Sequence, residues 1–105
     1  MVYPFLEEAI RFGVNTFILF PAIPESLKDS TATYSYHPDN FYLKAITNLK
    51  SRFPNAVFVS DVALDPYNID GHDGIVRNGE SLNDETLEVL AKMAMAQAQA
   101  GFDIL

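Results

Sequence analysis

The chain has 105 residues, and its 14 acidic and 7 basic side chains give it a formal charge of −7. This charge argues against nucleic acid or an anionic membrane as its partner, because both favour proteins with clustered Lys and Arg. Apolar residues make up 49% of the chain, which is enough for the core of one domain and excludes disorder, and no apolar run approaches the roughly 20 residues of a membrane-spanning helix. Cysteine is absent, which excludes disulfides, thiolate metal sites and thiol nucleophiles.

The first part of the chain predicts a helix, a strand and a long loop. Apolar residues recur at helical spacing in residues 5–10, and Gly13 is well placed to end that helix in a left-handed conformation. The continuous apolar run 16–20 is stopped by Pro21, which is typical of a strand covered on both faces. Residues 21–40 hold three of the six prolines and have no periodic pattern, so they predict a long loop, a kind of segment that often carries function.

A second helix and a second strand follow the long loop. A stripe of apolar residues predicts a helix that begins after an N-cap at Asp39 or Asn40 and ends at Pro54. The basic residues that should face water on this helix are Lys44, Lys50 and Arg52. The apolar run 56–60 then predicts a second buried strand, which leads directly into the acidic segment 61–74.

The last part of the chain predicts a hairpin, a third helix and the start of a third strand. The pair Asn78-Gly79 is typical of a tight hairpin turn. Asn83 can cap a helix that Gly101 ends, and residues 102–105 begin another apolar segment. The apolar face expected on this helix consists of Leu87, Leu90, Ala91, Ala94 and Ala98.

Helices and strands therefore alternate, with strands that begin near residues 16, 56 and 102, which is the order of repeated β/α units around a parallel sheet. An open doubly wound sheet and a closed (β/α)₈ barrel both have this order. Three strands would leave unpaired edges, and a closed barrel needs about 250 residues. The pattern predicts an α/β fold that is a piece of something larger, with ligands at the carboxyl ends of its strands.

Four aspartates lie within thirteen residues after the second strand, with no Lys or Arg among them: Asp61, Asp65, Asp70 and Asp73. Clustered carboxylates need a cation, backbone N–H donors or open solvent. Asp61, Asp65 and Asp73 could converge on a hard cation such as Mg²⁺, which uses one or two carboxylates and keeps several waters. Alternatively, Asp65 and Asp73 stabilise turns, and Asp61, which continues an apolar run, is buried and accepts backbone N–H bonds.

Two other polar segments leave alternatives open. His72 could be a ligand or a general acid, or it could be a loop residue that makes a structural hydrogen bond. Residues 28–31 could bind a carboxylate-bearing ligand or could be solvated loop. The sequence contains no glycine-rich phosphate loop, metal-spaced histidine pair or serine nucleophile elbow.

The sequence also resembles a known enzyme family. The segment 61–67 (DVALDPY), followed by 71–74 (GHDG), is similar to the metal-site segment of the porphobilinogen synthases, also called 5-aminolevulinate dehydratases. The similarity continues in the family's order over nearly the whole chain from about Gly13 onward. It includes residues 19–21 (LFP), 27–30 (LKDS), 52–54 (RFP), 82–86 (LNDET) and 98–101 (AQAG).

The resemblance implies a fold and an activity. Residues 1–105 would be a single partial domain, about three strands and three helices of a (β/α)₈ TIM barrel, with a long loop at 21–40 and an acidic active-site loop and hairpin at 61–80. Members of the family are hydro-lyases that condense two molecules of 5-aminolevulinate to porphobilinogen in tetrapyrrole and haem synthesis. They typically assemble as homo-octamers and work in the cytoplasm or in a plastid.

The resemblance also implies a cation site made of oxygen ligands. Zinc-dependent members place cysteines where this sequence has Ala63, Asp65 and Asp73, so Zn²⁺ is not expected here, whereas Mg²⁺ is, with Asp65 and Asp73 as ligands. Asp61 matches a family aspartate near the active-site pocket. This match implies a supporting catalytic role for Asp61, in which it orients substrate or moves a proton.

The covalent chemistry of the family implies residues that this sequence lacks. The family uses two lysines on later barrel strands, which form Schiff bases with the substrate carbonyls. None of the lysines here matches those positions: Lys28, Lys44, Lys50 and Lys92. We therefore expect a fragment that is inactive alone. The alternatives are a stand-alone acidic Mg²⁺-binding α/β module and a non-catalytic relic that associates with full-length subunits.

Overall fold

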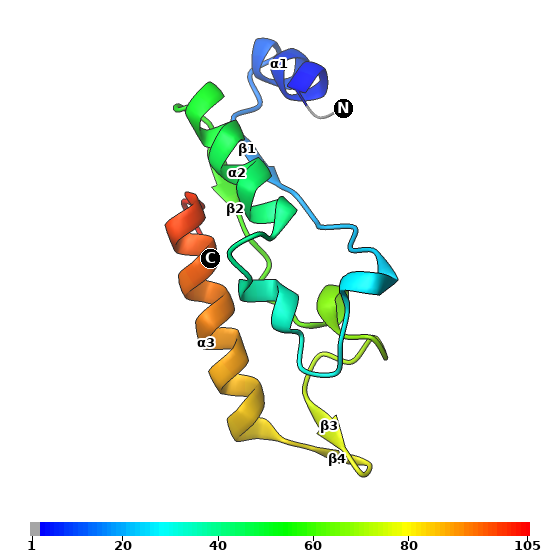
Figure 1. The fold of residues 1–105 in the computed structure, drawn as a ribbon. Helices are drawn as coiled ribbons and strands as arrows, with labels where there is room; N and C mark the ends of the chain where they lie inside the picture. Colours follow the sequence, from blue (N-terminus) through cyan, green and yellow to red (C-terminus); the bar gives the residue numbers. More distant parts are fainter. Residues whose placement is uncertain (1–2) are drawn as a thin grey trace.

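The computed structural model describes residues 3–105 and has an elongated shape of 50 by 23 by 22 Å (Figure 1). Its helices and strands are α1 (Tyr3–Arg11), β1 (Thr16–Ile18), α2 (Phe41–Arg52), β2 (Val57–Val59), β3 (Val76–Arg77), β4 (Glu80–Ser81) and α3 (Asn83–Ala100). Three short 3₁₀ helices lie in the long loops: η1 (Glu25–Leu27), η2 (Thr33–Tyr36) and η3 (Asp65–Tyr67).

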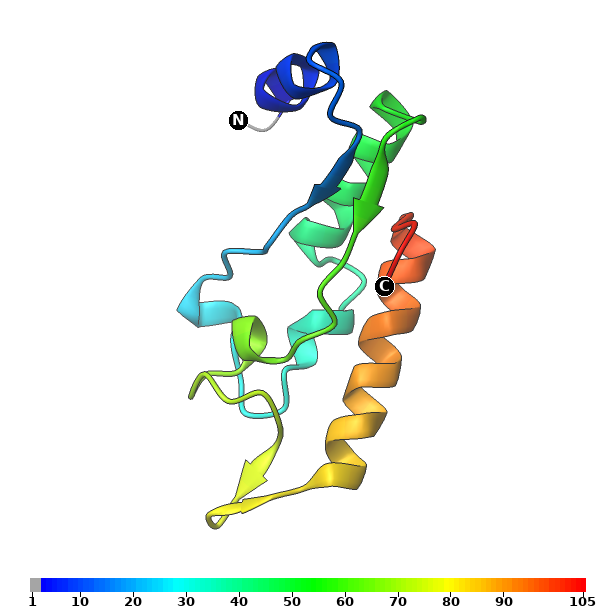
Figure 2. The ribbon, with the colours of Figure 1, turned by 180° about the vertical axis from the view of Figure 1, so that it is seen from behind.

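Strands β1 and β2 form a parallel pair in which Phe17 lies opposite Phe58 (Figure 2). A single parallel bridge joins Val59 to Ile104, so the predicted third strand is present as one residue pair. The mixed α/β order predicted from the sequence is confirmed. The first two strands span three residues each, which is shorter than the apolar runs that predicted them.

Strand β1 is covered on one face only. Phe17 is 8% exposed, whereas Ile18 is 52% exposed and Phe20, just after the strand, is 69% exposed. Phe17 and Phe58 pack into a cluster with α2, and in Figure 2 no described element crosses the opposite face of the two strands. The prediction of burial on both faces is therefore wrong for this chain, because alternate residues of a strand point to opposite faces and only one face has a partner layer.

Two hydrophobic clusters follow one another along the long axis. The first joins α1, α2, β1 and β2 around Phe58. The second lies within the two long loops and includes Leu64 and Tyr67. Helix α3 connects them, because Met93 belongs to the second cluster and Ala100 packs against the first. The position of the loops relative to the strands is thus set by one continuous helix.

Helix α2 begins at a buried cap. The side chain of Asn40 accepts hydrogen bonds from the backbone N–H groups of Tyr42, at 2.9 Å, and Leu43, at 3.4 Å. Of the two predicted N-cap residues, Asn40 is therefore confirmed and Asp39 is not. Asn40 has no exposed surface, so its cap also fixes α2 to the loop that precedes it.

Helix α3 buries a different face from the one the sequence predicted. Leu87 is 63% exposed, and the buried side chains are Val89, Met93 and Gln97. A spacing of four residues follows one ridge of a helix, and this ridge is the one that meets the rest of the fold. Gly101 ends the helix in a left-handed conformation, as predicted, with φ of 119°. No helix within residues 3–105 is long and apolar enough to cross a membrane.

Lys50 makes a structural contact instead of facing water as expected. Its ammonium group donates to the carbonyl of Ala56 and to the carboxylate of Asp103, both at 2.8 Å. The same carboxylate accepts the N–H of Phe58 at 2.9 Å. These bonds connect α2, β2 and the residues after α3. The hydrogen bonds from Lys50 and then from Phe58 lower the pKa of Asp103 below its ordinary value.

Replacing Asp103 with Asn should lower the free energy of unfolding by about 1 kcal/mol, a small value because the pair with Lys50 is partly exposed. Because folding lowers the pKa of Asp103, the carboxylate stabilises the fold fully above the ordinary value of 3.8, and this stabilisation is lost as the pH falls through the lower, folded value. Urea titrations should therefore show a smaller difference between wild type and D103N at pH 2 than at pH 7. E88Q, on the exposed side of α3, is the control, and equal differences at both pH values would contradict this role for the pair.

Candidate functional site

The two long loops leave the carboxyl ends of β1 and β2 and lie against each other. Because these strands are parallel, both loops emerge at the same end of the sheet (Figure 1). The N–H of Asp29 donates to the carbonyl of Tyr67 at 3.3 Å, and the N–H of Ile69 donates to the carbonyl of Asp29 at 3.0 Å. This short parallel bridge joins loop 21–40 to loop 61–80.

The carboxylate of Asp29 is used within its own loop. Its Oδ1 accepts the N–H groups of Thr31, at 3.1 Å, and Thr33, at 3.0 Å. Burial alone would raise the pKa of Asp29, but the hydrogen bonds from Thr33 and Thr31 outweigh it and hold the pKa below the ordinary value. Lys28 pairs with Glu25 at 3.1 Å. Residues 28–31 thus form an internally bonded turn, and their charged groups already have partners.

Buried side chains support the acidic loop from within. Leu64 and Tyr67 are each 1% exposed. The Tyr67 hydroxyl accepts a hydrogen bond from the side-chain amide of Asn40 at 3.4 Å, next to the start of α2. Burial raises the pKa of Tyr67, so this hydroxyl stays neutral. The turn η3, which carries Asp65, is therefore held on the body of the protein.

Asp65 and Asp73 lie together at the surface of this loop. Both residues are exposed, and Asp73 is the charged group that most strongly affects the carboxyl group of Asp65. Partial desolvation, followed by the hydrogen bond to Asp73 and the negative charge of that group, raises the pKa of Asp65. The charge of Asp61 adds a smaller effect in the same direction. Two carboxyl groups that share a site in this way favour a proton or a cation between them.

Asp61 is exposed, so the alternative in which it is buried and accepts backbone N–H bonds is wrong. The chain leaves the sheet at Ser60, which is 6% exposed, and then turns so that the N–H of Ala63 donates to the carbonyl of Asp61 at 3.0 Å. The side chain is consequently outside the apolar environment of the strand. The pKa of Tyr42 is raised, first by burial and then by its neighbours Tyr67 and Asp61. The charge of Asp61 therefore acts on a residue of the first cluster.

The aspartates do not form a three-ligand site. Among residues 3–105, no three side chains of the types that bind metals are grouped around one position. Asp61, Asp65 and Asp73 thus do not meet at one position in the described part of the chain, and Asp73 affects Asp65 more strongly than Asp61 does. His72, between them in sequence, is exposed. A carboxylate pair matches the ligands Mg²⁺ uses when it keeps several waters, and it lacks the sulfur and nitrogen on which zinc sites are built.

Two residues that hold the acidic loop in place were not identified from the sequence. Asn68 is 2% exposed, and its side chain contacts both long loops. The Thr86 hydroxyl accepts the N–H of Ile75 at 2.9 Å and donates to the carbonyl of Leu82 at 2.7 Å, which anchors the end of the loop to α3. The predicted cap Asn83 is instead the first residue of α3, which has no side-chain cap. Polar residues in irregular segments predict turns but do not indicate their partners.

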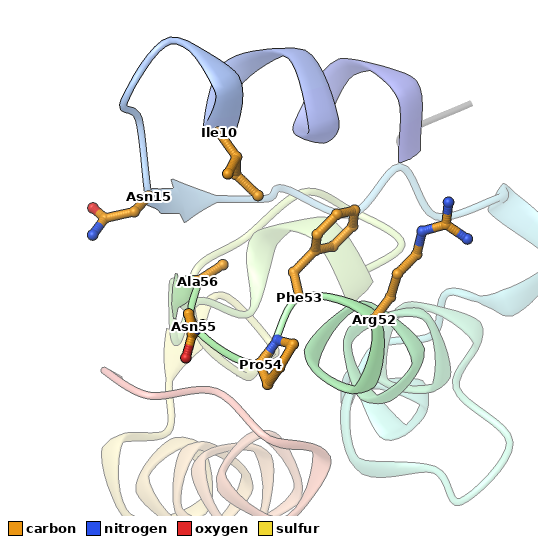
Figure 3. Close-up of a pocket in the computed structure, with 7 residues that line it drawn as sticks. All are labelled: Ile10, Asn15, Arg52, Phe53, Pro54, Asn55 and Ala56. Carbon is orange, nitrogen blue, oxygen red and sulfur yellow. The ribbon is translucent and has the colours of Figure 1, made fainter.

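A cavity of about 320 Å³ lies at the opposite end of the strands (Figure 3). It is lined by Ile10, Asn15 and residues 52–56. Figure 3 shows Ile10 and Phe53 extending toward each other between α1 and the end of α2. In parallel α/β folds, ligands bind at the carboxyl ends of strands, whereas this cavity adjoins their amino ends. The acidic loop is therefore the better candidate site.

Comparison with known proteins connects the chain to one enzyme family. The family model for delta-aminolevulinic acid dehydratase matches residues 1–105. The chloroplastic delta-aminolevulinic acid dehydratase of Selaginella martensii is 54% identical over 94 residues, which are 89% of this chain and 22% of that protein. The delta-aminolevulinic acid dehydratase of Chlamydia pneumoniae is 42% identical over 100 residues, which are 95% of this chain and 30% of that protein.

A solved structure has the same fold over nearly the whole chain. It is the delta-aminolevulinic acid dehydratase (porphobilinogen synthase) of Toxoplasma gondii ME49 in complex with the reaction product porphobilinogen. The similarity has a TM-score of 0.93 at 41% sequence identity and covers 97% of this chain and 30% of that chain. This chain thus spans about a quarter of the length of the relatives it matches.

Proposed function

We propose that this chain, which belongs to the delta-aminolevulinic acid dehydratase family, is one segment of a lyase. The lyase condenses two molecules of 5-aminolevulinate to porphobilinogen. The observation that carries the proposal is the family match over residues 1–105, together with a TM-score of 0.93 to a structure that holds porphobilinogen. The same match disfavours a stand-alone Mg²⁺-binding module.

The segment supplies part of a (β/α)₈ barrel in this proposal. Each parallel pairing is connected through a helix, α2 between β1 and β2, and α3 between β2 and Ile104. Exposed apolar side chains at Ile18 and Phe20 support the same conclusion, because the strands of a barrel carry apolar residues on two faces and need a layer on each. Further strands of the barrel would cover this open face.

Asp65 and Asp73 are the proposed Mg²⁺ ligands. Among the aspartates of the loop, Asp73 affects the carboxyl group of Asp65 most strongly, and Mg²⁺ uses one or two carboxylates at sites where it retains water. An Mg²⁺ ion bound there would supply positive charge and oriented water molecules. The like-charge contact that raises the pKa of Asp65 is the kind of repulsion that a divalent cation offsets.

Asp61 is the proposed supporting catalytic residue. It follows β2 directly, at the carboxyl end where barrel enzymes bind their substrates. Its side chain is exposed, and none of the ion pairs within residues 3–105 includes it. An unpaired carboxylate in this position can accept a hydrogen bond from the amino group of 5-aminolevulinate, or hold a proton during the reaction.

The covalent step is assigned to residues outside this segment. The Schiff-base lysines that the family resemblance implies lie on later barrel strands, whereas the lysines here lie in a loop or on a helix. Lys28 lies in loop 21–40, Lys44 and Lys50 lie on α2, and Lys92 lies on α3. The 105 residues alone are therefore proposed to be inactive.

The remaining features of the proposal concern the whole protein. We assign it a homo-octameric assembly and a location in the cytoplasm or a plastid. Several plant relatives are named as chloroplastic, among them those of Selaginella martensii and Arabidopsis thaliana, the second 48% identical over 101 residues. The named product in the Toxoplasma gondii structure supports a small-molecule substrate.

A chimera tests the proposed function. Residues 1–105 replace the matching segment of the Selaginella martensii relative, and porphobilinogen formation from 5-aminolevulinate is measured with Mg²⁺ and after chelation. We expect the chimera to form porphobilinogen, to lose most of this activity after chelation, and to surpass the 105-residue chain, which should form none. A folded chimera that forms no porphobilinogen contradicts the proposal.

The same chimera tests the role of Asp61. D61N should lower kcat by about 10²-fold or more, the effect expected when a group that moves a proton is lost. D70N is the matched control, because Asp70 is an exposed aspartate on the same loop. If D61N and D70N have the same kcat as the parent chimera, Asp61 has no catalytic role.

A further inference from the structure

We infer that Asn68 is the positioning residue that holds Asp73 against Asp65, through hydrogen bonds from its buried side chain to the end of the acidic loop and to loop 21–40. This role rests on the proposed function in so far as the carboxylate pair is the cation site. The shape of the loop can be measured without metal or substrate.

The side chain of Asn68 closes the acidic loop. Its Oδ1 accepts the N–H of Asp70 at 2.8 Å, which starts the turn. Its Nδ2 lies 3.5 Å from the carbonyl of Gly74, the residue that directly follows Asp73. One amide therefore bonds to the chain on both sides of the turn and brings Gly74 back toward η3, where Asp65 lies.

The same amide ties the loop to its neighbour. Nδ2 also lies 3.4 Å from the carbonyl of Ser30, beside the backbone bridge between Asp29 and Asn68. Asn68 is 2% exposed, so water is not available to replace these two acceptors. A primary amide has two N–H donors, and the two carbonyls satisfy both. The Asp29 carboxylate accepts hydrogen bonds from the backbone of Thr31 and Thr33, and these bonds fix the position of the Ser30 carbonyl between them.

Helix α3 holds the other side of Gly74. The N–H of Ile75 donates to the Thr86 hydroxyl at 2.9 Å. A Cβ atom added at Gly74 would lie 3.3 Å from that hydroxyl, which leaves little space for any other residue. Gly74 is thus held between Asn68 and α3. These contacts restrain the backbone next to Asp73.

The need for such a restraint follows from charge. Asp65 and Asp73 are both exposed and both acidic, and like charges in solvent separate unless something holds them. Lys and Arg are absent from residues 53–76, so no cationic side chain of the loop itself can bridge them. The contacts of Asn68 with Ser30, Asp70 and Gly74 supply the restraint from the backbone.

Thiol cross-linking tests this inference, because the chain contains no cysteine of its own. The double variant D65C/D73C is treated with dibromobimane, which becomes fluorescent when it bridges two thiols. We expect it to be bridged at least about tenfold faster than D70C/N78C, a pair with the same separation in sequence, since effective concentration depends on geometry. Adding N68A should remove most of this advantage, whereas N48A, an exposed asparagine on α2, should leave it unchanged.

A second variant separates positioning from general destabilisation. N68D keeps the Oδ1 acceptor for Asp70 but removes both Nδ2 donors, so it should slow bridging as N68A does, while the amide hydrogen of Asp70 stays protected from exchange. Circular dichroism establishes whether each variant is folded. If N68A does not fold, the bridging rate of N68D decides whether Asn68 positions Asp73. Unchanged bridging in a folded N68 variant, or equal rates for the two cysteine pairs, would overturn the role of Asn68.

Mg²⁺ titration of the wild-type chain separates this inference from the proposed function. Calorimetric binding that N68A weakens would support both. Absence of Mg²⁺ binding together with the expected cross-linking result would overturn the proposed cation site and still support Asn68 as the residue that positions Asp73.

Discussion

Replacing Phe58 with Ala should lower the free energy of unfolding by about 3–5 kcal/mol. Phe58 has no exposed surface and lies in β2, the strand that pairs with β1 and bridges to Ile104. Its ring is 6.1 Å from that of Phe17, between centroids. Truncation removes buried apolar area and leaves a cavity in the cluster that joins α1 and α2 to the sheet.

Urea unfolding followed by circular dichroism measures this effect. Domains of this size are stable by about 5–15 kcal/mol, so F58A should lose a large part of its stability and unfold at a clearly lower urea concentration than the wild type. F12A is the matched control, because Phe12 is 78% exposed and its removal should change stability by less than about 0.5 kcal/mol. Similar values for the two variants would show that the first cluster is not the core of the fold.

The order of the elements could be predicted from the sequence because it depends on local patterns. Helical periodicity, a cap and a stop located α2 between Asn40 and Pro54, and the pair Asn78-Gly79 predicted the β3–β4 hairpin, where Asn78 has a φ of 51°. These features involve residues close together in sequence. Glycine and proline also act locally, as Gly101 does at the end of α3.

Burial could not be predicted as well, because it depends on which layers pack on each element. The run 16–20 has the composition of a fully covered strand, but Ile18 and Phe20 are exposed where no described element packs. On α3, both Leu87 and Val89 are apolar, and only the position of the helix against the rest of the fold decides that Val89 is the buried one. Apolar periodicity alone does not distinguish these faces.

The candidate site could likewise be predicted only in part. The acidic segment could be recognised from composition and from the family resemblance, and in the structure the charge of Asp73 is among the causes that raise the pKa of Asp65. The exposure of Asp61 could not be predicted, since it depends on how the chain leaves β2. The partners of Asn68 lie in two loops, so no sequence pattern indicated them.

We propose that this segment supplies carboxylates to a dehydratase while its lysines take no part in the covalent step. None of the four lysines lies on a strand: Lys28 is in loop 21–40, and Lys44, Lys50 and Lys92 lie on α2 and α3. The effect is therefore expected to be all-or-none. No lysine of residues 1–105 should form a Schiff base with 5-aminolevulinate, whether in the isolated chain or in the chimera.

Borohydride reduction of the chimera in the presence of 5-aminolevulinate, followed by peptide mass spectrometry, tests this claim most directly. The reduction converts any Schiff base into a stable adduct whose mass and position can be read. We predict adducts on lysines of the segments contributed by the Selaginella martensii relative, and none on Lys28, Lys44, Lys50 or Lys92. A substrate adduct on any one of those four lysines would contradict the account.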